Sequence, residues 1–381
     1  MRLLHTSDWH IGRTFHGHST LPHLRGVLAG LAELTAREHV DAVLVAGDVF
    51  DSAAPSAEAF LLFEQAVGAL REAGAVVVMT SGNHDSVARL GHQARFAAAG
   101  GVHVRTRHER LDDPVVLRDA HGVVDVYGIP YLEPVLVRAA YPDAVLKTHH
   151  QVLTHAMDRV RSTAAARGNR SVVLSHCFAA GVRATDVERD ISAGGVDLVP
   201  AGVFDGPDYV ALGHIHGRAR LTERVRYSGA PLHYSFGERR GPRGAWLVQL
   251  DAAGLAGVEW RDLPVPRPLT QLQGELQVLL TDPALADREQ HWIAAVLTDA
   301  VRQQDAMARL QARFPFAVQL EHRPPAVAGE HRTYTERMRG RSDVDVVGDF
   351  LQHVRGARPD AEESALLGDV LATVAARESA A

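Results

Sequence analysis

Cysteine is almost absent from this sequence: Cys177 is the only one among 381 residues. A single thiol forms no internal disulfide and no thiolate cage, so a bound metal ion must use His, Asp, Glu or Asn side chains, and Cys177 itself is expected to be a small buried residue. Lysine is equally scarce, because the 40 basic residues include only Lys147. The Ala- and Gly-rich background indicates that coding bias, rather than phosphate binding, explains this preference for arginine.

Long apolar runs are also missing, since none approaches the ~18 residues that a membrane-spanning helix needs. The first residues lack the basic-then-apolar order of a secretory signal. We therefore expect a cytoplasmic protein that contacts no membrane. A net charge of −6 argues against general binding of polyanions, although a local basic groove would not appear in the sum.

The composition is that of a globular protein, with 46% hydrophobic and 23% charged residues. Disordered chains, collagen and small disulfide scaffolds are excluded. At one domain per ~100 to 200 residues, the length predicts two or three domains.

Apolar runs of strand length alternate with helical patterns in the first part of the chain. Residues 42–46 and 76–79 are continuously apolar, while apolar side chains recur at helical spacing over residues 21–38 and 60–70. Such strands separated by helices predict an α/β fold in which a sheet is covered on both faces. Further strands are predicted at residues 3–4, 123–129, 171–174, 209–212, 225–228 and 245–250.

Three prolines in residues 262–268 predict a domain boundary, because proline neither continues a helix nor donates to a central strand. The predicted core domain therefore spans residues 1–266. Residues 267–322 predict a small α+β domain with a possible strand at 276–280, an apolar run at 292–297, a helix over 305–313 and a strand at 316–320.

Residues 323–342 are rich in Pro, Gly and Arg without periodicity, which is typical of a linker. Residues 343–381 predict two amphipathic helices. Short isolated helices are marginal in water, so these helices either dock on a partner or fold back on their own chain. The apolar residues that we expect in a docking surface are Phe350, Leu351, Leu367 and Val370.

Polar, metal-capable side chains directly follow five of the predicted strands. Ligands in open α/β sheets bind beyond the carboxyl ends of the strands, so these side chains are expected to converge in one crevice. Residues i and i+2 of an extended chain project to the same side, which pairs Asp8 with His10 and His214 with His216. The full set of expected metal ligands is Asp8, His10, Asp48, Asn83, His176, His214 and His216.

Seven donors exceed what one tetrahedral ion takes, whereas two ions roughly 3.5 to 4 Å apart that share a carboxylate can use them all. Carboxylate, amide and imidazole ligands without sulfur favour Mn, Fe, Zn or Mg over Cu. Any one of these motifs alone is more typical of a solvated turn. Other histidines lack this context and are expected at the surface, among them His16, His18, His23, His149 and His150.

This ordered set of motifs resembles the calcineurin-like metallophosphoesterase superfamily. The intervening stretches TSDWHIGR, GDVFD, SGNHDSVARLG, YGIPY, LGHIHG and VRYSGAPLHYSFGE resemble the SbcD family, the nuclease subunits of bacterial SbcC-SbcD DNA-repair complexes. WIAAVLTDA and ARLQARFPFAVQL resemble the capping domain of that family, so the likeness covers nearly the whole chain. STLPHLRG at residues 19–26 departs from the acidic-glutamine pair expected there.

The resemblance implies specific roles for the site residues. One metal ion would be held by Asp8, His10, Asp48 and His216, and the other by Asp48, Asn83, His176 and His214, with Asp48 bridging the two. His84 would steady or protonate the leaving oxygen, a role suited to an imidazole because its ordinary pKa is about 6.5. Asp85 would hydrogen-bond the His84 imidazole from behind or, equally, cap a turn.

The resemblance further implies the fold, function and partners. The fold would be a metallophosphoesterase core of sheets flanked by helices, with an α+β capping domain and a C-terminal helical pair. The function would be a DNA double-strand exonuclease and hairpin or single-strand endonuclease in DNA repair and recombination. The protein would use two divalent ions, with Mn expected in preference to Mg, Fe or Zn. Two copies of the chain would form a homodimer within a heterotetramer that also contains an SbcC-like coiled-coil ATPase.

The residues alone predict DNA binding less strongly, because no zinc finger, basic helix or aromatic ladder appears. Arg13, just beyond the first ligand motif, and the added capping domain favour a DNA substrate. The alternatives are a stand-alone phosphatase or phosphodiesterase, which would need neither the cap nor the terminal helices, and a non-catalytic scaffold, which would have no chemical reason to keep every donor and His84.

Overall fold

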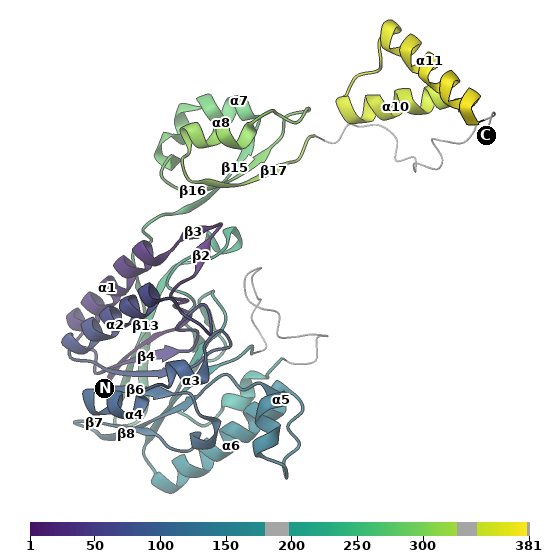
Figure 1. Cartoon of the computed structure of the whole chain (residues 1–381). Coiled ribbons are helices and arrows are strands. Elements are labelled where there is room, and N and C mark those ends of the chain that lie inside the picture. Colours follow the sequence, from purple (N-terminus) through teal and green to yellow (C-terminus); the bar gives the residue numbers. More distant parts are fainter. Residues whose placement is uncertain (180–197, 326–340, 379–381) are drawn as a thin grey trace. The chain divides into compact units, whose positions relative to one another are not determined.

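The computed structural model describes residues 1–179, 198–325 and 341–378. It divides into a core unit, Met1–Leu269, and a second unit, Thr270–Ala381 (Figure 1). Among the described residues, no helix combines the length and apolarity that crossing a bilayer requires. Most of the predicted linker, residues 326–340, and the last residues, 379–381, lie outside the described residues, and the predicted domain limits stay predictions.

The first sheet of the core unit has six strands. In spatial order they are β14 (Gly254–Asp262), β13 (Gly244–Asp251), β1 (Arg2–Thr6), β4 (Ala42–Ala46), β5 (Val76–Thr80) and β6 (Val102–Arg105). β1, β4, β5 and β6 run parallel, and β13 joins β1 antiparallel. The apolar runs at residues 42–46 and 76–79 are therefore confirmed as neighbouring parallel strands.

The second sheet also has six strands. Their order is β11 (Ala219–Arg220), β12 (Val225–Tyr227), β10 (Tyr209–Gly213), β9 (Arg170–His176), β8 (Gly122–Ile129) and β7 (Val115–Asp119). Strands β8, β9, β10 and β12 run parallel, so their carboxyl ends lie at one edge.

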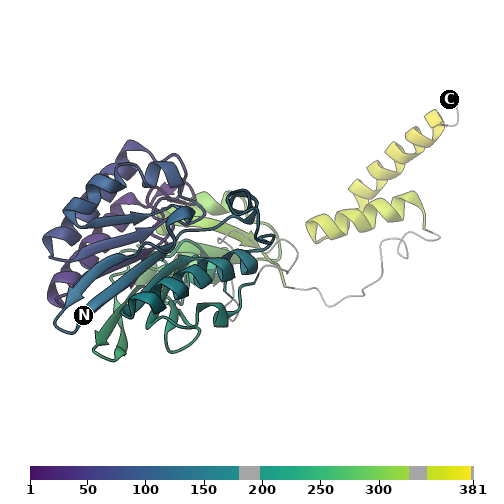
Figure 2. The ribbon, with the colours of Figure 1, turned by 90° about the horizontal axis from the view of Figure 1, so that it is seen from below.

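The two sheets face each other across an apolar layer that includes Leu3, Leu44, Val126, Val172 and Trp246 (Figure 2). Helices pack on the two outer faces. The expectation of a sheet covered on both faces is confirmed: helices cover one face of each sheet, and the other sheet covers the second face. The sheets flanked by helices that the resemblance implied are confirmed.

Helix α1 (Leu21–Arg37) and helix α2 (Ala57–Glu72) cover the first sheet with an apolar face. Leu24, Leu28 and Leu31 of α1 are fully buried at the spacing the sequence predicted, and burial of each such side chain contributes about 1.5 to 3 kcal/mol. Helix α6 (His149–Arg167) covers the second sheet; Thr148 and Gln151 form a capping box at its start, and Gly168 ends it in a left-handed conformation.

Short elements complete the core unit. They are the hairpin of β2 (Thr14–Phe15) and β3 (His18–Ser19), and the helices α3 (Val87–Leu90), α4 (Ala94–Ala97) and α5 (Pro134–Val137).

The second unit contains a sheet in the order β15 (Leu269–Gly274), β16 (Trp292–Leu297) and β17 (Ala317–His322), together with α7 (Leu276–Thr281) and α8 (Ala306–Arg313). The strand predicted at residues 276–280 was wrong, because this segment is helix α7. Leu276 and Leu279 are buried three residues apart in one apolar cluster with Leu310, a helical spacing. A run this short fits either structure from sequence alone.

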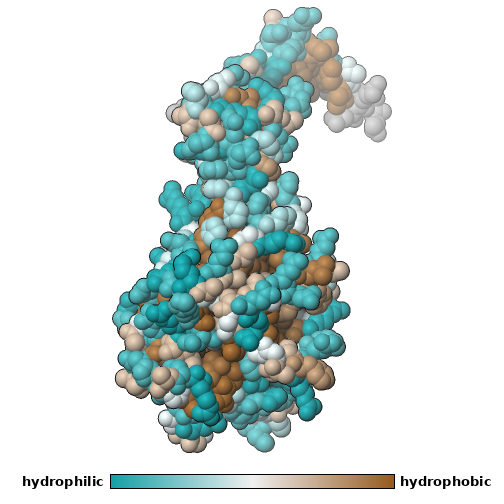
Figure 3. Space-filling view, turned by 90° about the vertical axis from the view of Figure 1, so that its left-hand side faces the viewer, coloured by the Kyte–Doolittle hydropathy of each residue, from teal (hydrophilic) through white to brown (hydrophobic). Residues whose placement is uncertain are grey.

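Two helices, α10 (Asp343–Arg355) and α11 (Ala361–Glu378), end the described chain and pack against each other. Ser342 caps α10 by accepting a hydrogen bond from the Asp345 N–H group, and Arg355 pairs with Glu363 across the turn. Both helices carry exposed apolar side chains, among them Phe350 and Val370. Figure 3 shows hydrophobic surface on this helix pair.

Candidate metal centre

The seven predicted donors lie at the carboxyl ends of strands in both sheets. Asp8 and His10 follow β1, Asp48 follows β4, and Asn83 follows β5. In the second sheet, His176 is the last residue of β9, and His214 and His216 follow β10, which lies beside β9 in parallel register. Six of the seven are buried and Asn83 is half-buried, so the two sheets bring these polar groups together at one end of the sandwich.

Backbone strain is concentrated at these donors. Asp8, His10, Asp48 and His214 have positive φ angles of 53°, 44°, 47° and 106°. Such conformations cost about 1 to 3 kcal/mol each in residues other than glycine and persist where the surroundings impose them. Here two hydrogen bonds join the loop after β1 to the loop after β4. The Asp8 N–H group donates to the Gly47 carbonyl and the His10 N–H group donates to the Asp48 carbonyl, both at 3.0 Å.

Two glycines allow the strand ends to approach closely. A Cβ atom on Gly213 would lie 1.8 Å from the Ala46 carbonyl oxygen. The absence of a side chain at Gly213 therefore lets the end of β10 in the second sheet approach the end of β4 in the first. A Cβ atom on Gly47, whose φ is 81°, would lie 2.3 Å from the His176 Nδ1 atom. Any side chain at either position would displace the loops that carry the donors.

The donors form two clusters that share Asp48. In the first, the Nε2 atoms of His10 and His216 lie 3.0 Å apart, and Asp8 offers a carboxylate oxygen within 4.8 Å of both rings. In the second, the Asn83 Oδ1 atom lies 3.0 Å from His176 Nε2 and 3.2 Å from His214 Nδ1.

Asp48 Oδ2 lies between the clusters, 3.6 Å from His10 Nε2 and 3.5 Å from His176 Nε2. One carboxylate oxygen is therefore within reach of a cation in either cluster. The bridging role that the family resemblance implies for Asp48 stays a prediction, and this position of Oδ2 allows it.

Hydrogen bonds on the far side of the rings set the tautomers of two histidines. His176 donates from Nδ1 to the Ala46 carbonyl at 2.9 Å, and His216 donates from Nδ1 to Glu238 Oε1 at 3.3 Å. Each ring therefore turns an Nε2 lone pair toward the centre, as metal-binding histidines do.

Burial and crowding favour the neutral form of three of the imidazoles, those of His10, His176 and His214. Burial lowers the pKa of His10 and His214 well below the usual value, and neighbouring imidazoles add to the effect; burial also lowers the pKa of His176. Neutral imidazole is the form that binds metal ions. Without a cation, His176 Nε2 and Asn83 Oδ1 would place two lone pairs 3.0 Å apart, so the residues present fit a metal ion at this position.

His84 lies beside Asp48 with its Nε2 atom 3.9 Å from Asp48 Oδ2. Its Nδ1–H group donates to the Asp51 carbonyl at 2.9 Å, and its backbone N–H group donates to Asp48 Oδ1 at 2.9 Å. The ring is about 10% exposed, so its Nε2 atom faces the centre from a position that a bound ester could contact.

Asp85 has a different environment from the one expected behind His84. Its carboxylate accepts hydrogen bonds from the backbone N–H groups of Val49, Phe50 and Gly82 at 2.9 to 3.1 Å. Burial, and then the nearby Asp48 charge, raises the pKa of Asp85 to about 7. These contacts favour the turn-capping alternative, because Asp85 joins the loop after β4 to the loop after β5.

Sequence reasoning assigned no role to Asp51 or Glu238. Glu238 holds His216 from behind and is itself paired with Arg243, whose Nη2 lies 2.5 Å from Glu238 Oε2. Burial by itself would raise the pKa of Glu238, but the hydrogen bond and charge of His216 and the charge of Arg243 lower it. The only sequence signal was that these acids end two of the family-like stretches, GDVFD and VRYSGAPLHYSFGE.

Glu238→Gln should lower the free energy of unfolding by about 3 kcal/mol, because Arg243 would keep a buried charge without its partner. Both side chains are only about 1% exposed. Urea unfolding measures the change. The matched control is Glu259→Gln, which removes an exposed partner of Arg261 and should cost no more than about 1 kcal/mol. Equal stability of the two variants would contradict the prediction.

The expectation that His149 lies at the surface was wrong. His149 is buried in the first turn of α6, and its ring lies 5.5 Å from that of Tyr131, which in turn is 6.4 Å from the His176 ring. His16, His18 and His150 are exposed as expected, whereas His23 is half-buried.

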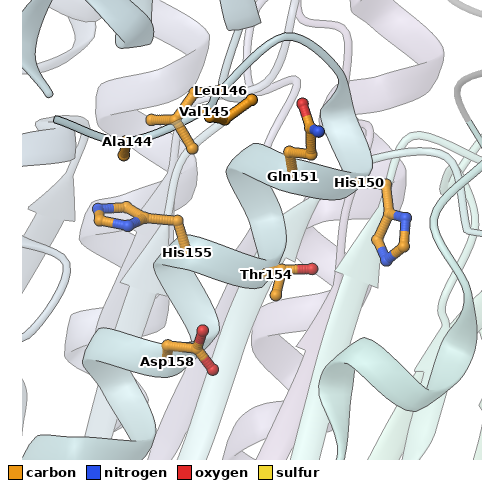
Figure 4. Close-up of a pocket in the computed structure, with 8 residues that line it drawn as sticks. All are labelled: Ala144, Val145, Leu146, His150, Gln151, Thr154, His155 and Asp158. Atoms are coloured by element: carbon orange, nitrogen blue, oxygen red, sulfur yellow. The ribbon is translucent and has the colours of Figure 1, made fainter. Parts of the chain in front are cut away.

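A separate pocket of about 390 Å³ lies between α6 and the segment of residues 144–146 (Figure 4). It does not belong to the metal centre, because no predicted site residue lines it. The lining residues are Ala144, Val145, Leu146, His150, Gln151, Thr154, His155 and Asp158.

Two family models match the chain. The calcineurin-like phosphoesterase model matches residues 1–218, a range that contains all seven donors. A second model, SbcD_C, described as the type 5 capsule protein repressor C-terminal domain, matches residues 265–355. The crystal structure of TT1561 of Thermus thermophilus aligns with 68% of this chain and 98% of its own, at 15% sequence identity and a TM-score of 0.39.

Proposed function

We propose that this chain, which belongs to the calcineurin-like phosphoesterase family, is a DNA nuclease. In this proposal it is the nuclease subunit of an SbcC-SbcD-like complex. The observation that carries the proposal is the combination of a complete donor set in residues 1–218 with an SbcD-type domain at residues 265–355. A phosphoesterase site explains the core, and the added domain favours DNA over a small ester.

The chain's own residues have distinct tasks in this proposal. One ion would be held by Asp8, His10, Asp48 and His216, and the second by Asp48, Asn83, His176 and His214. Two divalent ions bound there would supply Lewis-acid stabilisation and an activated water, with manganese as the expected metal. His84 would hold a proton at Nε2 for the leaving oxygen, while the Asp51 carbonyl fixes the ring through Nδ1.

Arg13 supports a phosphodiester substrate. Its guanidinium lies 5.0 Å from the centre of the Tyr234 ring and donates to Asp51 Oδ1 at 3.1 Å, while Asp51 is also near His10 and His84. The side chain is about 15% exposed, so a planar cation borders the site where a phosphate would bind.

The proposal is tested by incubating the protein with end-labelled duplex, hairpin and single-stranded DNA in Mn²⁺ or Mg²⁺, beside a small phosphodiester. We expect cleavage of the DNA substrates. Hydrolysis of the small ester alone would instead support a stand-alone phosphodiesterase. No hydrolysis of any substrate by metal-loaded protein would support a non-catalytic scaffold.

We further propose that α10 and α11 dock on the coiled-coil base of an SbcC-like ATPase, within a heterotetramer that contains two copies of this chain. Phe350 is 56% exposed and Val370 is 51% exposed, while Leu351 and Leu367 are half-buried. Apolar side chains left in water on a helix pair are what helix-in-groove recognition uses. The alternative is that these side chains pack on their own chain.

Joint substitution Phe350→Glu and Val370→Glu should weaken partner binding about tenfold or more, because two charges would enter an apolar interface. Co-purification and a binding titration with the ATPase measure this effect. The control pair Gln352→Glu and Ala372→Glu adds the same charge at exposed positions outside the apolar set and should bind as the wild type does. Native affinity of the first pair would refute docking through this surface.

A further inference from the structure

Two aromatic side chains border the second cluster of donors. The Tyr131 ring centre lies 6.4 Å from that of His176, with an angle of 80° between the ring planes. The Phe178 ring centre lies 6.0 Å from that of His214, with an angle of 56°. Each histidine that faces Asn83 therefore has an aromatic neighbour, and neither neighbour has a task in the proposed hydrolysis.

The fold places both rings at the same edge of the second sheet. Tyr131 follows the end of β8 by two residues, and Phe178 follows the end of β9 by two residues. β8 and β9 are parallel neighbours in which Ile129 is paired with Ser175, so their carboxyl ends lie side by side. Tyr131 and Phe178 are 47 residues apart in the sequence, so no local spacing indicates a shared surface.

Hydrogen bonds hold Tyr131 in this position. Its N–H group donates to the Ser81 carbonyl at 2.8 Å, which joins it to the loop that carries Asn83. Its hydroxyl donates to Glu133 Oε2 at 3.2 Å, and its ring centre lies 5.5 Å from that of the buried His149. A side chain that is already fixed loses little conformational freedom when a ligand stacks on it.

Phe178 is anchored on one side and accessible on the other. It packs against the apolar cluster that lies between the second sheet and α6, and its carbonyl accepts from the Val199 N–H group at 3.2 Å. Phe178 and Tyr131 are both half-buried. Part of each ring therefore reaches solvent beside a candidate metal ligand.

The charges next to the two clusters differ in sign. Arg13 lies on the side of the first cluster, where its charge contributes to the lowered pKa of His10. Beside the second cluster, the Tyr131 hydroxyl contacts the Glu133 carboxylate. A carboxylate repels a phosphate, whereas a nucleobase is uncharged and presents a π-face to an aromatic ring. The first side therefore suits the nucleic-acid backbone, and the second side suits a base.

We propose that Tyr131 and Phe178 form a stacking subsite for an unpaired nucleobase next to the scissile phosphate. The proposal rests on the proposed DNA nuclease function and adds a determinant of substrate choice to it. Every base has a π-face, so the subsite favours nucleotides without selecting a sequence. An unpaired base is also easier to place there than one that must leave a duplex. The competing explanation is that both rings only pack the loops that carry His176 and Asn83.

The experiment compares two single-stranded substrates of equal length and charge with the metal-loaded full chain. One is oligothymidine, and the other is the same oligomer with every base replaced by hydrogen. The wild type should cleave oligothymidine with a kcat/KM about 5- to 100-fold higher, the range expected for one base–aromatic stack. This comparison needs no variant, so the proposal stays testable if a substitution prevents folding.

Three variants assign the preference to the rings. Tyr131→Leu should lower kcat/KM for oligothymidine about 5- to 100-fold through a higher KM, because stacking binds ground state and transition state alike. Its kcat/KM for the base-free oligomer should stay within about twofold of the wild type. Phe178→Leu should act in the same direction. Tyr131→Phe keeps the ring and loses only the hydrogen bond to Glu133, so it should keep the wild-type preference.

The outcomes separate the subsite from the function. Equal kcat/KM of the wild type for the two oligomers would overturn the subsite and leave the proposed function standing. Equal losses on both oligomers in Tyr131→Leu, together with weaker Mn²⁺ binding in a calorimetric titration, would assign the ring to packing alone. Loss of the preference in Tyr131→Phe would assign it to the hydroxyl instead of to stacking. Cleavage of neither oligomer by the metal-loaded wild type would overturn both proposals.

Discussion

Asp48→Asn is expected to abolish phosphodiester hydrolysis and to lower the bound metal by more than one ion per chain. The reason is that Asp48 Oδ2 lies between the two clusters, 3.6 Å from His10 Nε2 and 3.5 Å from His176 Nε2. An amide supplies no negative charge to offset two neighbouring divalent cations, so both would bind less tightly. Elemental analysis after gel filtration measures the metal content, and a small phosphodiester measures the activity.

The same variant should keep the fold. Asn at position 48 can still accept the His84 N–H hydrogen bond, which reaches Asp48 Oδ1. Asp41→Asn is the matched control, because Asp41 is an exposed aspartate at the opposite end of β4 whose carboxylate accepts from the Arg2 N–H group. It should retain activity and metal content. Full loading with two ions in the Asp48 variant would refute the bridging role.

His84→Gln is expected to keep both metal ions and to lower turnover by about 10²- to 10⁴-fold, the range for removal of a general acid or base. The His84 ring is fixed through Nδ1 and turns Nε2 toward the centre, so glutamine would keep polarity there without a group that transfers a proton. The measurements are kcat for the small phosphodiester and metal content by elemental analysis.

The geometry also allows a competing role for His84. His10, Asp48 and His84 each offer a ligand atom within 4.8 Å of the others, so His84 could itself bind a metal ion. Loss of metal in His84→Gln would establish that role and contradict proton transfer. His92→Gln, an exposed histidine eight residues further along the chain, is the control and should match the wild type in both measurements.

Patterns of residues that are close in sequence were sufficient to predict most of the helices and strands and to identify the candidate ligands. The continuous apolar run at residues 42–46 and the helical spacing over residues 21–38 depend on neighbours in sequence, and both are observed as predicted. The same patterns show that Asp8, Asp48 and His214 come directly after predicted strands. Parallel strands place their carboxyl ends at one edge of a sheet, so these residues were expected to lie close together. Their roles as metal ligands remain a prediction that Asp48→Asn and its control test.

Hydrophobic periodicity was insufficient to predict the structure of short segments. It was also insufficient where tertiary packing decides which side chains are buried. Residues 276–280 fit a strand or a helix, and the shared apolar cluster with α8 selects helix α7. His149 carries no local signal of burial, yet the start of α6 places it beside Tyr131. A strand that is apolar on both sides requires two covering layers, but its sequence does not distinguish a helix from a second sheet.

The sequence by itself determined the fold class, the family resemblance and the seven candidate donors, because these depend on residue type and on spacing along the chain. Tertiary structure alone decided that two sheets face each other, that Glu238 holds His216, and that Asp51 lies behind both His10 and His84. These contacts join separate segments of the chain, Asp51 and His10 being 41 residues apart. No local pattern specifies them, since they form only when the strands and loops have packed.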